Sequence, residues 1–217
     1  MALYIDSADR SVVEPLLSTG LFRGIATNPT LLSRAGLRQA DLPEFHRWAV
    51  DRGAGTVFMQ TLGTTPETIG RSGRALRDLG EGVVVKVPAT RAGLTAARTL
   101  ADDGVPVLVT AVYHPSQALV AIAVGAAFIA PYVGRMDDHG RDGVRSALTI
   151  QQVVDGTGIR VLVASLRNLD DVAALAAGGV SDFALNPDLA AALLADELTD
   201  AAAADFEAAA TQDALPR

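Results

Sequence analysis

The residue of this sequence whose type and place most clearly indicate covalent chemistry is Lys86. The chain has 18 lysine and arginine side chains, and Lys86 is the one that is not arginine. It lies in the apolar run Val83–Val87, where an unpaired ammonium ion would be costly. Burial of a lysine favours the neutral amine, which can attack a carbonyl carbon, whereas a guanidinium stays protonated. We therefore predict covalent catalysis by Lys86. The alternatives are a structural buried lysine paired with a carboxylate, or a lysine left by chance in a chain that otherwise uses arginine.

Polar side chains also end other apolar runs, each two residues after an apolar side chain. Because strand side chains alternate, the two members of each pair are expected to share one face of a strand. The pairs are Asp6 with Tyr4, Asn28 with Ala26, Gln60 with Phe58, Lys86 with Val84, Thr110 with Leu108, Tyr132 with Ala130, and Ser165 with Val163. In a parallel barrel these polar ends converge at one mouth, where barrel enzymes have their active sites. Any one of them alone could be a cap or a turn residue.

The elements that would carry these residues are short apolar runs, each followed by a longer helical pattern. They are Leu3–Ser7, Gly24–Asn28, Val57–Thr61, Val83–Val87, Val107–Val112, Ala127–Tyr132, Val161–Ser165 and Asp182–Asn186. This α/β alternation predicts a (β/α)8 TIM barrel. An open doubly wound sheet would show the same alternation, and the count of eight favours closure.

Capping residues indicate where several helices begin and end. Thr65 and Asn186 each precede a proline, Asn168 precedes an apolar helical pattern, and Gly178 with Gly179 is typical of a helix stop. An additional alanine-rich C-terminal helix with a tail, residues 197–217, lies outside the barrel repeat. We expect it to cover a barrel end or to dock on a neighbouring subunit.

Composition narrows the class of protein. A length of 217 residues predicts a single domain over residues 1–217, and 49% hydrophobic with 5% aromatic residues suits strands buried on both faces. The net charge of -7 argues against a nucleic-acid or anionic-membrane surface and favours a small-molecule partner. The chain has no cysteine, and its three histidines lack metal-ligand spacing.

Two further features bear on location. The chain begins without a recognisable secretory signal, so we expect it in the cytoplasm. The uncharged stretch 118–133 is interrupted by Gly125 and Pro131, which argues against a membrane span.

The sequence resembles the transaldolase family, in particular its short, fructose-6-phosphate aldolase-like branch. The segments that carry the resemblance are Leu3–Ser7, Gly24–Thr30, Val85–Thr90, Thr110–Tyr113, Ala130–Asp137 and Ala164–Arg167. They span nearly the whole chain. The resemblance implies a (β/α)8 barrel, Schiff-base chemistry with no metal or other cofactor, and ring-like homo-oligomers, either pentamers or decamers.

The resemblance also implies roles for individual residues. Lys86 would be the Schiff-base nucleophile, with Asp6, Gln60, Thr110 and Tyr132 as the other catalytic residues that hold a water and move protons. Substrate binding would fall to Thr27 and Asn28 at the sugar hydroxyls and to Arg135, Ser165 and Arg167 at the phosphate. The chain has Ala26 and Thr30 where the family usually has threonine and serine. Its Gln60 and Tyr132 match the aldolase branch, because transaldolases proper tend to carry glutamate and phenylalanine there.

The resemblance implies a class I aldolase that cleaves or forms the C3–C4 bond of a ketose or ketose phosphate, with a three-carbon dihydroxyacetone unit. A transaldolase, which passes that unit to an aldose phosphate, is the main alternative. A deoxyribose-phosphate-type aldolase and a non-catalytic sugar-phosphate-binding barrel are further alternatives. The physiological donor and acceptor stay open.

Overall fold

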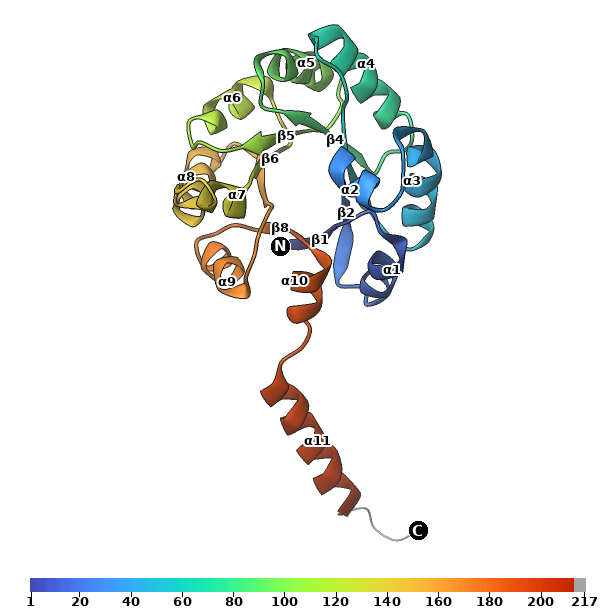
Figure 1. Ribbon diagram of the computed structural model, residues 1–217. Helices are drawn as coiled ribbons and strands as arrows, with labels where there is room; N and C mark the ends of the chain where they lie inside the picture. The colour runs from blue at the N-terminus through green and yellow to red at the C-terminus, as the bar shows by residue number, and fades with distance from the viewer. Residues whose placement is uncertain (213–217) are drawn as a thin grey trace.

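Eight parallel strands close into one barrel in the computed structural model, which describes residues 1–212 (Figure 1). The strands are β1 (Ala2–Asp6), β2 (Phe22–Ala26), β3 (Thr56–Gln60), β4 (Val83–Pro88), β5 (Val107–Val112), β6 (Phe128–Pro131), β7 (Arg160–Val163) and β8 (Asp182–Leu185). Each strand pairs with the next, and β8 pairs with β1. The predicted (β/α)8 barrel is confirmed, and each predicted run overlaps one strand.

Helices connect the strands and form the outer ring of the barrel. They are α1 (Arg10–Ser18), α2 (Pro29–Arg34), α3 (Leu42–Asp51) after the short 3-10 helix η1 (Gln39–Asp41), α4 (Pro66–Arg77), α5 (Arg91–Asp102), α6 (Gln117–Val124), α7 (Val133–Asp137), α8 (Gly143–Val154) and α9 (Leu169–Ala177). After the last strand come α10 (Pro187–Ala192) and α11 (Glu197–Gln212), of which α11 lies outside the ring.

The predicted helix ends are confirmed. The side chains of Thr65, Asn168 and Asn186 each accept a hydrogen bond from the backbone N–H three residues later, which satisfies a free donor of the first helical turn. Helix α9 ends at Gly178, and Gly179 follows with a φ of 94°, a conformation that glycine adopts without strain.

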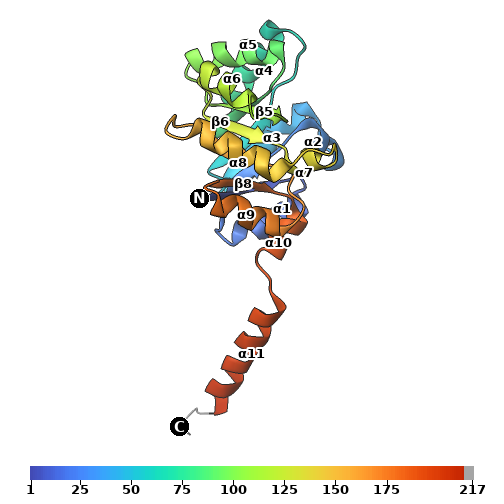
Figure 2. The ribbon, with the colours of Figure 1, turned by 90° about the vertical axis from the view of Figure 1, so that its left-hand side faces the viewer.

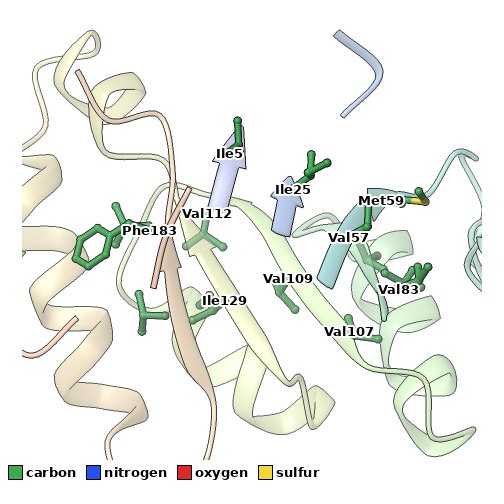
Figure 3. Packing of buried hydrophobic residues seen from close by; sticks show 14 of the residues in the cluster. Ile5, Ile25, Val57, Met59, Val83, Val107, Val109, Val112, Ile129 and Phe183 are labelled. Carbon is green, nitrogen blue, oxygen red and sulfur yellow. The ribbon is translucent and has the colours of Figure 1, made fainter. Parts of the chain in front are cut away.

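The barrel has two apolar layers because strand side chains alternate between faces. The outer layer fills the space between strands and helices and includes Ile5, Val57 and Phe183 (Figure 3). Aromatic rings occupy the barrel interior: Tyr4 packs edge-on against Phe58, which packs edge-on against Phe128, with centroid separations of 5.0 and 5.2 Å. These rings fill the barrel interior beneath the cavity at the carboxyl ends of the strands.

The C-terminal helix is present as predicted, but α11 does not cover a barrel end. Figures 1 and 2 show it extending away from the barrel, where Leu198 and Phe206 are 81% and 73% exposed. The predicted tail beyond residue 212 lies outside the described residues. Docking on a neighbouring subunit stays a prediction.

Within residues 1–212, no helix combines the length and the apolar character needed to cross a membrane. The uncharged stretch 118–133 is divided as predicted, because Gly125 ends α6 with a φ of 77° and β6 begins at Phe128.

Gly24 tests how closely neighbouring strands approach in this barrel. A Cβ atom at Gly24 would lie 1.8 Å from the Thr56 carbonyl oxygen, whereas one at Gly55 would meet nothing closer than 3.6 Å. Because a backbone atom cannot move aside, Gly24→Ala should lower the free energy of unfolding by about 1–3 kcal/mol. Gly55→Ala is the control and should change it by less than about 0.5 kcal/mol. Urea unfolding followed by circular dichroism measures both, and equal effects would contradict the prediction.

Candidate active site

A cavity of about 170 Å³ opens at the carboxyl ends of the strands. Its walls combine polar strand ends with small alanines, whose size leaves room for a ligand. The lining residues are Asp6, Ala26, Asn28, Thr30, Leu31, Arg34, Lys86, Leu108, Ala130, Tyr132, Arg135, Leu162, Ala164, Ser165, Ala184 and Asn186. Helices α2 and α7, which contribute to this wall, lie in Figure 2 at the end of the barrel opposite the N-terminus.

Lys86 reaches this cavity from the middle of the barrel wall. Lys86 is 4% exposed, and its Nζ donates a hydrogen bond of 2.8 Å to the backbone carbonyl of Thr27. Strand register places it between Gln60 on β3 and Leu108 on β5. Within residues 1–212, no carboxylate lies within ion-pair distance of this amine. The carboxylate partner that a purely structural lysine would need is therefore missing from this part of the chain.

Thr27 does not lie where the expected substrate-binding role would need it. Its side chain is fully buried, and its Oγ1 donates 3.1 Å to the carbonyl of Phe58. The Thr27 backbone N–H donates to the same carbonyl at 2.9 Å and so extends the ladder between β2 and β3. Thr27 thus faces the sheet, and only its carbonyl, which holds Lys86, is directed at the site.

Asp6 lies on the cavity wall at the end of β1 and is partly buried. Burial raises the pKa of the Asp6 carboxyl above its ordinary value of 3.8, and the charges of Lys86 and Arg135 oppose that rise. Removal from water therefore outweighs the neighbouring positive charges. A carboxyl in this condition is suited to accept and return a proton.

Tyr132 brings a phenol to the same cavity. Its Oη lies 2.9 Å from the Thr110 Oγ1, and the Tyr113 ring packs edge-on against it with centroids 5.8 Å apart. The guanidinium of Arg135 lies 5.2 Å from the centre of the Tyr132 ring. Thr110 is buried and does not line the cavity itself. It touches the site through the Tyr132 hydroxyl.

Gln60 ends β3 and is the register neighbour of Lys86, but it does not belong to the cavity wall. The cavity lining therefore gives no support to the predicted contact between Gln60 and a bound water.

Ser165 lines the cavity, but not for the reason predicted from strand alternation. Val163 belongs to the outer layer, while Leu162 and Ala164 point into the barrel. Ser165 has a φ of 61°, a left-handed conformation that interrupts the alternation and turns the residue toward the cavity. Its carbonyl accepts a hydrogen bond of 2.9 Å from Gly134, which ties this strained residue to α7. In the other predicted pairs of a polar strand-end residue with an apolar residue two positions earlier, the apolar residue lies in the barrel interior.

The two arginines expected at the phosphate lie in different places. Arg135 lines the cavity, and its Nη1 donates to the Tyr113 hydroxyl at 3.4 Å. Arg167 lines a neighbouring hollow instead, where its guanidinium forms an ion pair with Asp138. Ser165 and Asn186 line both hollows.

Sequence reasoning missed several residues of the cavity wall, namely Thr30, Leu31 and Arg34 on α2 and Asn186 before α10. A signal for Asn186 was present, because the pair Asn186-Pro187 repeats the pair Asn28-Pro29 at the end of another strand. Both asparagines cap a helix through Oδ1, which leaves the amide Nδ2 of Asn28 to donate into the cavity. No comparable signal marks Arg34.

Comparison with known proteins gives two kinds of similarity. The family described as Transaldolase/Fructose-6-phosphate aldolase matches residues 3–216. A probable transaldolase of Rhodospirillum centenum (strain ATCC 51521 / SW) is 37% identical over 211 residues, which cover 96% of this chain and 90% of the relative. A probable transaldolase of Caulobacter sp. (strain K31) is 35% identical over 202 residues, or 92% of each chain.

Among solved structures, a mandelate oxidase aligns with a TM-score of 0.60 at 16% identity, covering 87% of this chain and 66% of that one. That similarity concerns the barrel fold alone.

The raised pKa of Asp6 predicts a pH-dependent gain in stability for Asp6→Asn. The folded chain favours the protonated form of Asp6. The contribution of this form to the free energy of unfolding is therefore fully present below pH 3.8 and is lost as the pH rises through the higher folded-state pKa. Asparagine cannot ionise, so the variant should gain unfolding free energy relative to the parent as the pH rises toward neutrality. Urea unfolding over a pH series measures this, with the exposed Asp51→Asn on α3 as control. A pH-independent difference would rule the prediction out.

Proposed function

The chain belongs to the transaldolase and fructose-6-phosphate aldolase family, and on that premise we propose that it is a class I aldolase whose Schiff base forms on Lys86. Family membership makes it an enzyme of the aldolase and transaldolase class. One observation carries the finer proposal: Lys86 is buried at the cavity with a carbonyl as its hydrogen-bond partner and no carboxylate within ion-pair distance in residues 1–212. An amine held at the cavity by a carbonyl, and not by a carboxylate, is placed to attack a substrate carbonyl carbon.

In the proposed reaction, the neutral amine of Lys86 attacks the ketose carbonyl carbon, and the resulting carbinolamine loses water to give an iminium ion. The Thr27 carbonyl, 2.8 Å from Nζ, fixes the direction from which the amine approaches. Asn28 donates from its Nδ2 to a sugar hydroxyl, since its Oδ1 is occupied by the Leu31 backbone N–H.

Cleavage of the C3–C4 bond sends its electron pair into the iminium ion and leaves an enamine of the three-carbon unit. The C4 hydroxyl must lose its proton as the aldehyde departs. Asp6 is the proposed acceptor, because its pKa is raised by burial toward the range in which a base can take up and return a proton.

Release of dihydroxyacetone requires that the enamine be protonated at carbon and the iminium then hydrolysed by water. Tyr132 is the proposed proton donor, since Tyr132 lines the cavity and its hydroxyl is held by Thr110 at 2.9 Å. Gln60, next to Lys86 in register, is the proposed partner of the water molecule. A neutral glutamine can orient water but cannot exchange a proton at working pH.

A transaldolase is the second candidate, because the relatives at 35–37% identity are named probable transaldolases. In that case the enamine would wait for an acceptor aldehyde instead of being protonated. The pair Gln60 and Tyr132 supports the aldolase, since by resemblance transaldolases tend to carry glutamate and phenylalanine. Two-substrate assays separate the two candidates.

The proposed substrate is a ketose or its phosphate, with Arg135 and Ser165 at the anionic end. Arg135 lines the cavity and offers a planar fork of donors that matches a phosphate group. For the assembly we propose a ring-like homo-oligomer in the cytoplasm. The exposed Leu198 and Phe206 on α11 support docking of this helix on a neighbouring subunit.

Borohydride reduction tests the Schiff base directly. With dihydroxyacetone or fructose 6-phosphate present, borohydride should leave one covalent adduct on Lys86, because the N-terminus is the only other amine of the chain. Intact-mass analysis and peptide mapping locate the adduct. Lys86→Met should show neither adduct nor turnover while keeping the circular dichroism spectrum of the parent. An active preparation that gains no ketose-dependent adduct would refute the Schiff base.

Tyr132→Phe tests the branch of the family. Loss of the proton donor should reduce aldol cleavage by roughly two orders of magnitude. Gln60→Glu combined with Tyr132→Phe should raise the ratio of transfer to dihydroxyacetone release, measured with erythrose 4-phosphate as acceptor.

Tyr4→Phe is the matched control, since the Tyr4 side chain is buried in the barrel interior and does not line the cavity. It should leave cleavage unchanged. A parent enzyme that transfers efficiently but releases almost no dihydroxyacetone would replace the aldolase with the transaldolase.

A further inference from the structure

Ala111, near the end of β5, has a backbone conformation that alanine rarely adopts. Its φ of 57° is left-handed, and among the non-glycine residues of 1–212 only Ser165 shares this feature. Elsewhere in this part of the chain the left-handed positions are occupied by glycine, as at Gly104 and Gly125. Strain of this kind persists only where the surrounding structure imposes it, and it is concentrated at functional sites.

The conformation of Ala111 accompanies a β-bulge between β5 and β6. Val109 pairs with Ile129. The next pair joins Val112 to Pro131, so β5 has one more residue than β6 between the two pairs. Pro131 has no N–H to donate to β5, and prolines within sheets are found at such bulges. The missing donor explains why the regular ladder is interrupted at this point.

The extra residue inverts the side-chain alternation of β5. Before the bulge, Leu108 belongs to the barrel interior and Val109 to the outer layer. After the bulge, Val112 belongs to the outer layer and Tyr113 packs against the interior cluster. In a regular strand, Tyr113 would share the outward face of Val109. The bulge at Ala111 is therefore what brings Tyr113 to the inner side of the barrel.

The phenol of Tyr132 is held by residues on both sides of the bulge. Thr110, which precedes Ala111, lies with its Oγ1 2.9 Å from the Tyr132 Oη. Tyr113, which follows the bulge, packs its ring edge-on against that of Tyr132, with centroids 5.8 Å apart. The bulge therefore sets how these two supports are placed around the phenol.

Both left-handed residues also border the backbone of Tyr132. Ala111 precedes Val112, whose carbonyl accepts the Tyr132 N–H at 3.1 Å. Ser165 follows Ala164, which forms a parallel bridge with Tyr132. The two strained positions of β5 and β7 thus flank the end of β6, where Tyr132 lies.

Tyr113 itself belongs to an ordered segment. Its N–H donates to the Gln117 Oε1 at 2.9 Å, and its carbonyl accepts a hydrogen bond of 2.9 Å from the Arg141 Nη1. The ring that packs on Tyr132 is therefore fixed from both sides of the chain, and it keeps its place as long as β5 keeps the bulge.

We propose that Ala111 is a positioning residue for Tyr132, whose phenol its left-handed bulge holds in the orientation that delivers a proton to the enamine carbon. This inference rests on the proposed function, in which Tyr132 is the proton donor. The proton leaves the Tyr132 oxygen, the electron pair of the carbon–carbon double bond forms the new C–H bond, and the nitrogen lone pair restores the iminium ion. Ala111 acts through Tyr132 and takes no part in the chemistry itself.

Deuterium exchange of dihydroxyacetone isolates this proton transfer. In D2O, loss of a carbon-bound proton from the iminium ion gives the enamine, and protonation by solvent-exchanged Tyr132 returns deuterium to the carbon. Proton NMR follows the loss of the C–H signal, and Lys86→Met gives the background rate. Borohydride trapping with dihydroxyacetone on the same preparations measures Schiff-base formation, which does not need Tyr132.

Ala111→Asn and Ala111→Thr separate backbone conformation from side-chain size. The two side chains are similar in size, but asparagine tolerates the left-handed conformation and β-branched threonine does not. Ala111→Thr should slow exchange about tenfold or more while trapping stays within about twofold of the parent. Ala111→Asn should exchange at least about threefold faster than Ala111→Thr, and Ala111→Gly should stay within about twofold of the parent. Equal losses in Ala111→Asn and Ala111→Thr would overturn the inference.

Ala89→Thr is the matched control for the added side chain. Ala89 directly follows β4, is half-buried as Ala111 is, and does not have a left-handed backbone. The variant should leave both exchange and trapping unchanged. A loss of exchange as large as that of Ala111→Thr would contradict a specific role for Ala111.

Combination with Tyr132→Phe tests whether Ala111 acts through the phenol. At enzyme concentrations that raise the residual exchange of Tyr132→Phe above the Lys86→Met background, adding Ala111→Thr should slow it no further. Losses that multiply would indicate a general effect on the barrel and would overturn the inference. Exchange at the parental rate in folded Ala111→Thr would overturn it too.

Tyr113→Leu decides the question if circular dichroism shows that Ala111→Thr does not fold. It removes the ring that the bulge brings to Tyr132 and leaves β5 unchanged, so exchange should slow about threefold or more while trapping is preserved. Exchange at the parental rate would overturn the inference. A parent that is not trapped by borohydride refutes the proposed function itself, whereas normal trapping with unaltered exchange in the variants refutes only the role of Ala111.

Discussion

The hydrogen bond between the Lys86 amine and the Thr27 carbonyl is the contact on which the site depends. A lysine that is 4% exposed needs a partner, and a carboxylate partner would stabilise its charge. A backbone carbonyl 2.8 Å away accepts a hydrogen bond from either the ammonium or the neutral amine. It therefore holds the side chain in place without committing it to the charged form. Thr27 can serve in this way because its own N–H and hydroxyl are both bound to Phe58 on β3.

Residues at the carboxyl ends of the strands cap the following helices and also line the cavity. Asn28 and Asn186 illustrate this, since each accepts a backbone N–H at the start of a helix and each lines the cavity. In Asn28 the hydrogen bond that begins the helix leaves the amide Nδ2 to donate into the cavity, whereas the Nδ2 of Asn186 donates to the Leu166 carbonyl at 3.3 Å. A site built from such residues is as rigid as the barrel that carries it, which favours a fixed geometry for proton transfer.

A strained backbone and close packing occur together on the side of the cavity formed by α7 and the end of β7. Ser165 adopts a left-handed conformation, and its carbonyl binds the Gly134 N–H at 2.9 Å. Gly134 in turn leaves the space in which Arg167 packs. These contacts depend on one another: a side chain at position 134 would disturb both the carbonyl of Ser165 and the arginine. On the wall formed by α2, Arg34 makes no ion pair within residues 1–212.

The sequence by itself determined the features that depend on neighbours along the chain. Alternation of apolar runs with helical patterns predicted the eight strands, and the capping residues predicted where helices begin. The lone lysine in an apolar run predicted a buried side chain, which lies at the cavity. The tertiary structure alone decided what depends on segments far apart in the sequence. It turned Thr27 toward β3, brought Ser165 into the cavity against the strand alternation, and paired Arg167 with Asp138 while leaving Arg34 at the cavity. An arginine looks the same in sequence whether or not a distant carboxylate binds it, because its reach and its partner are set by how the helices pack around the barrel.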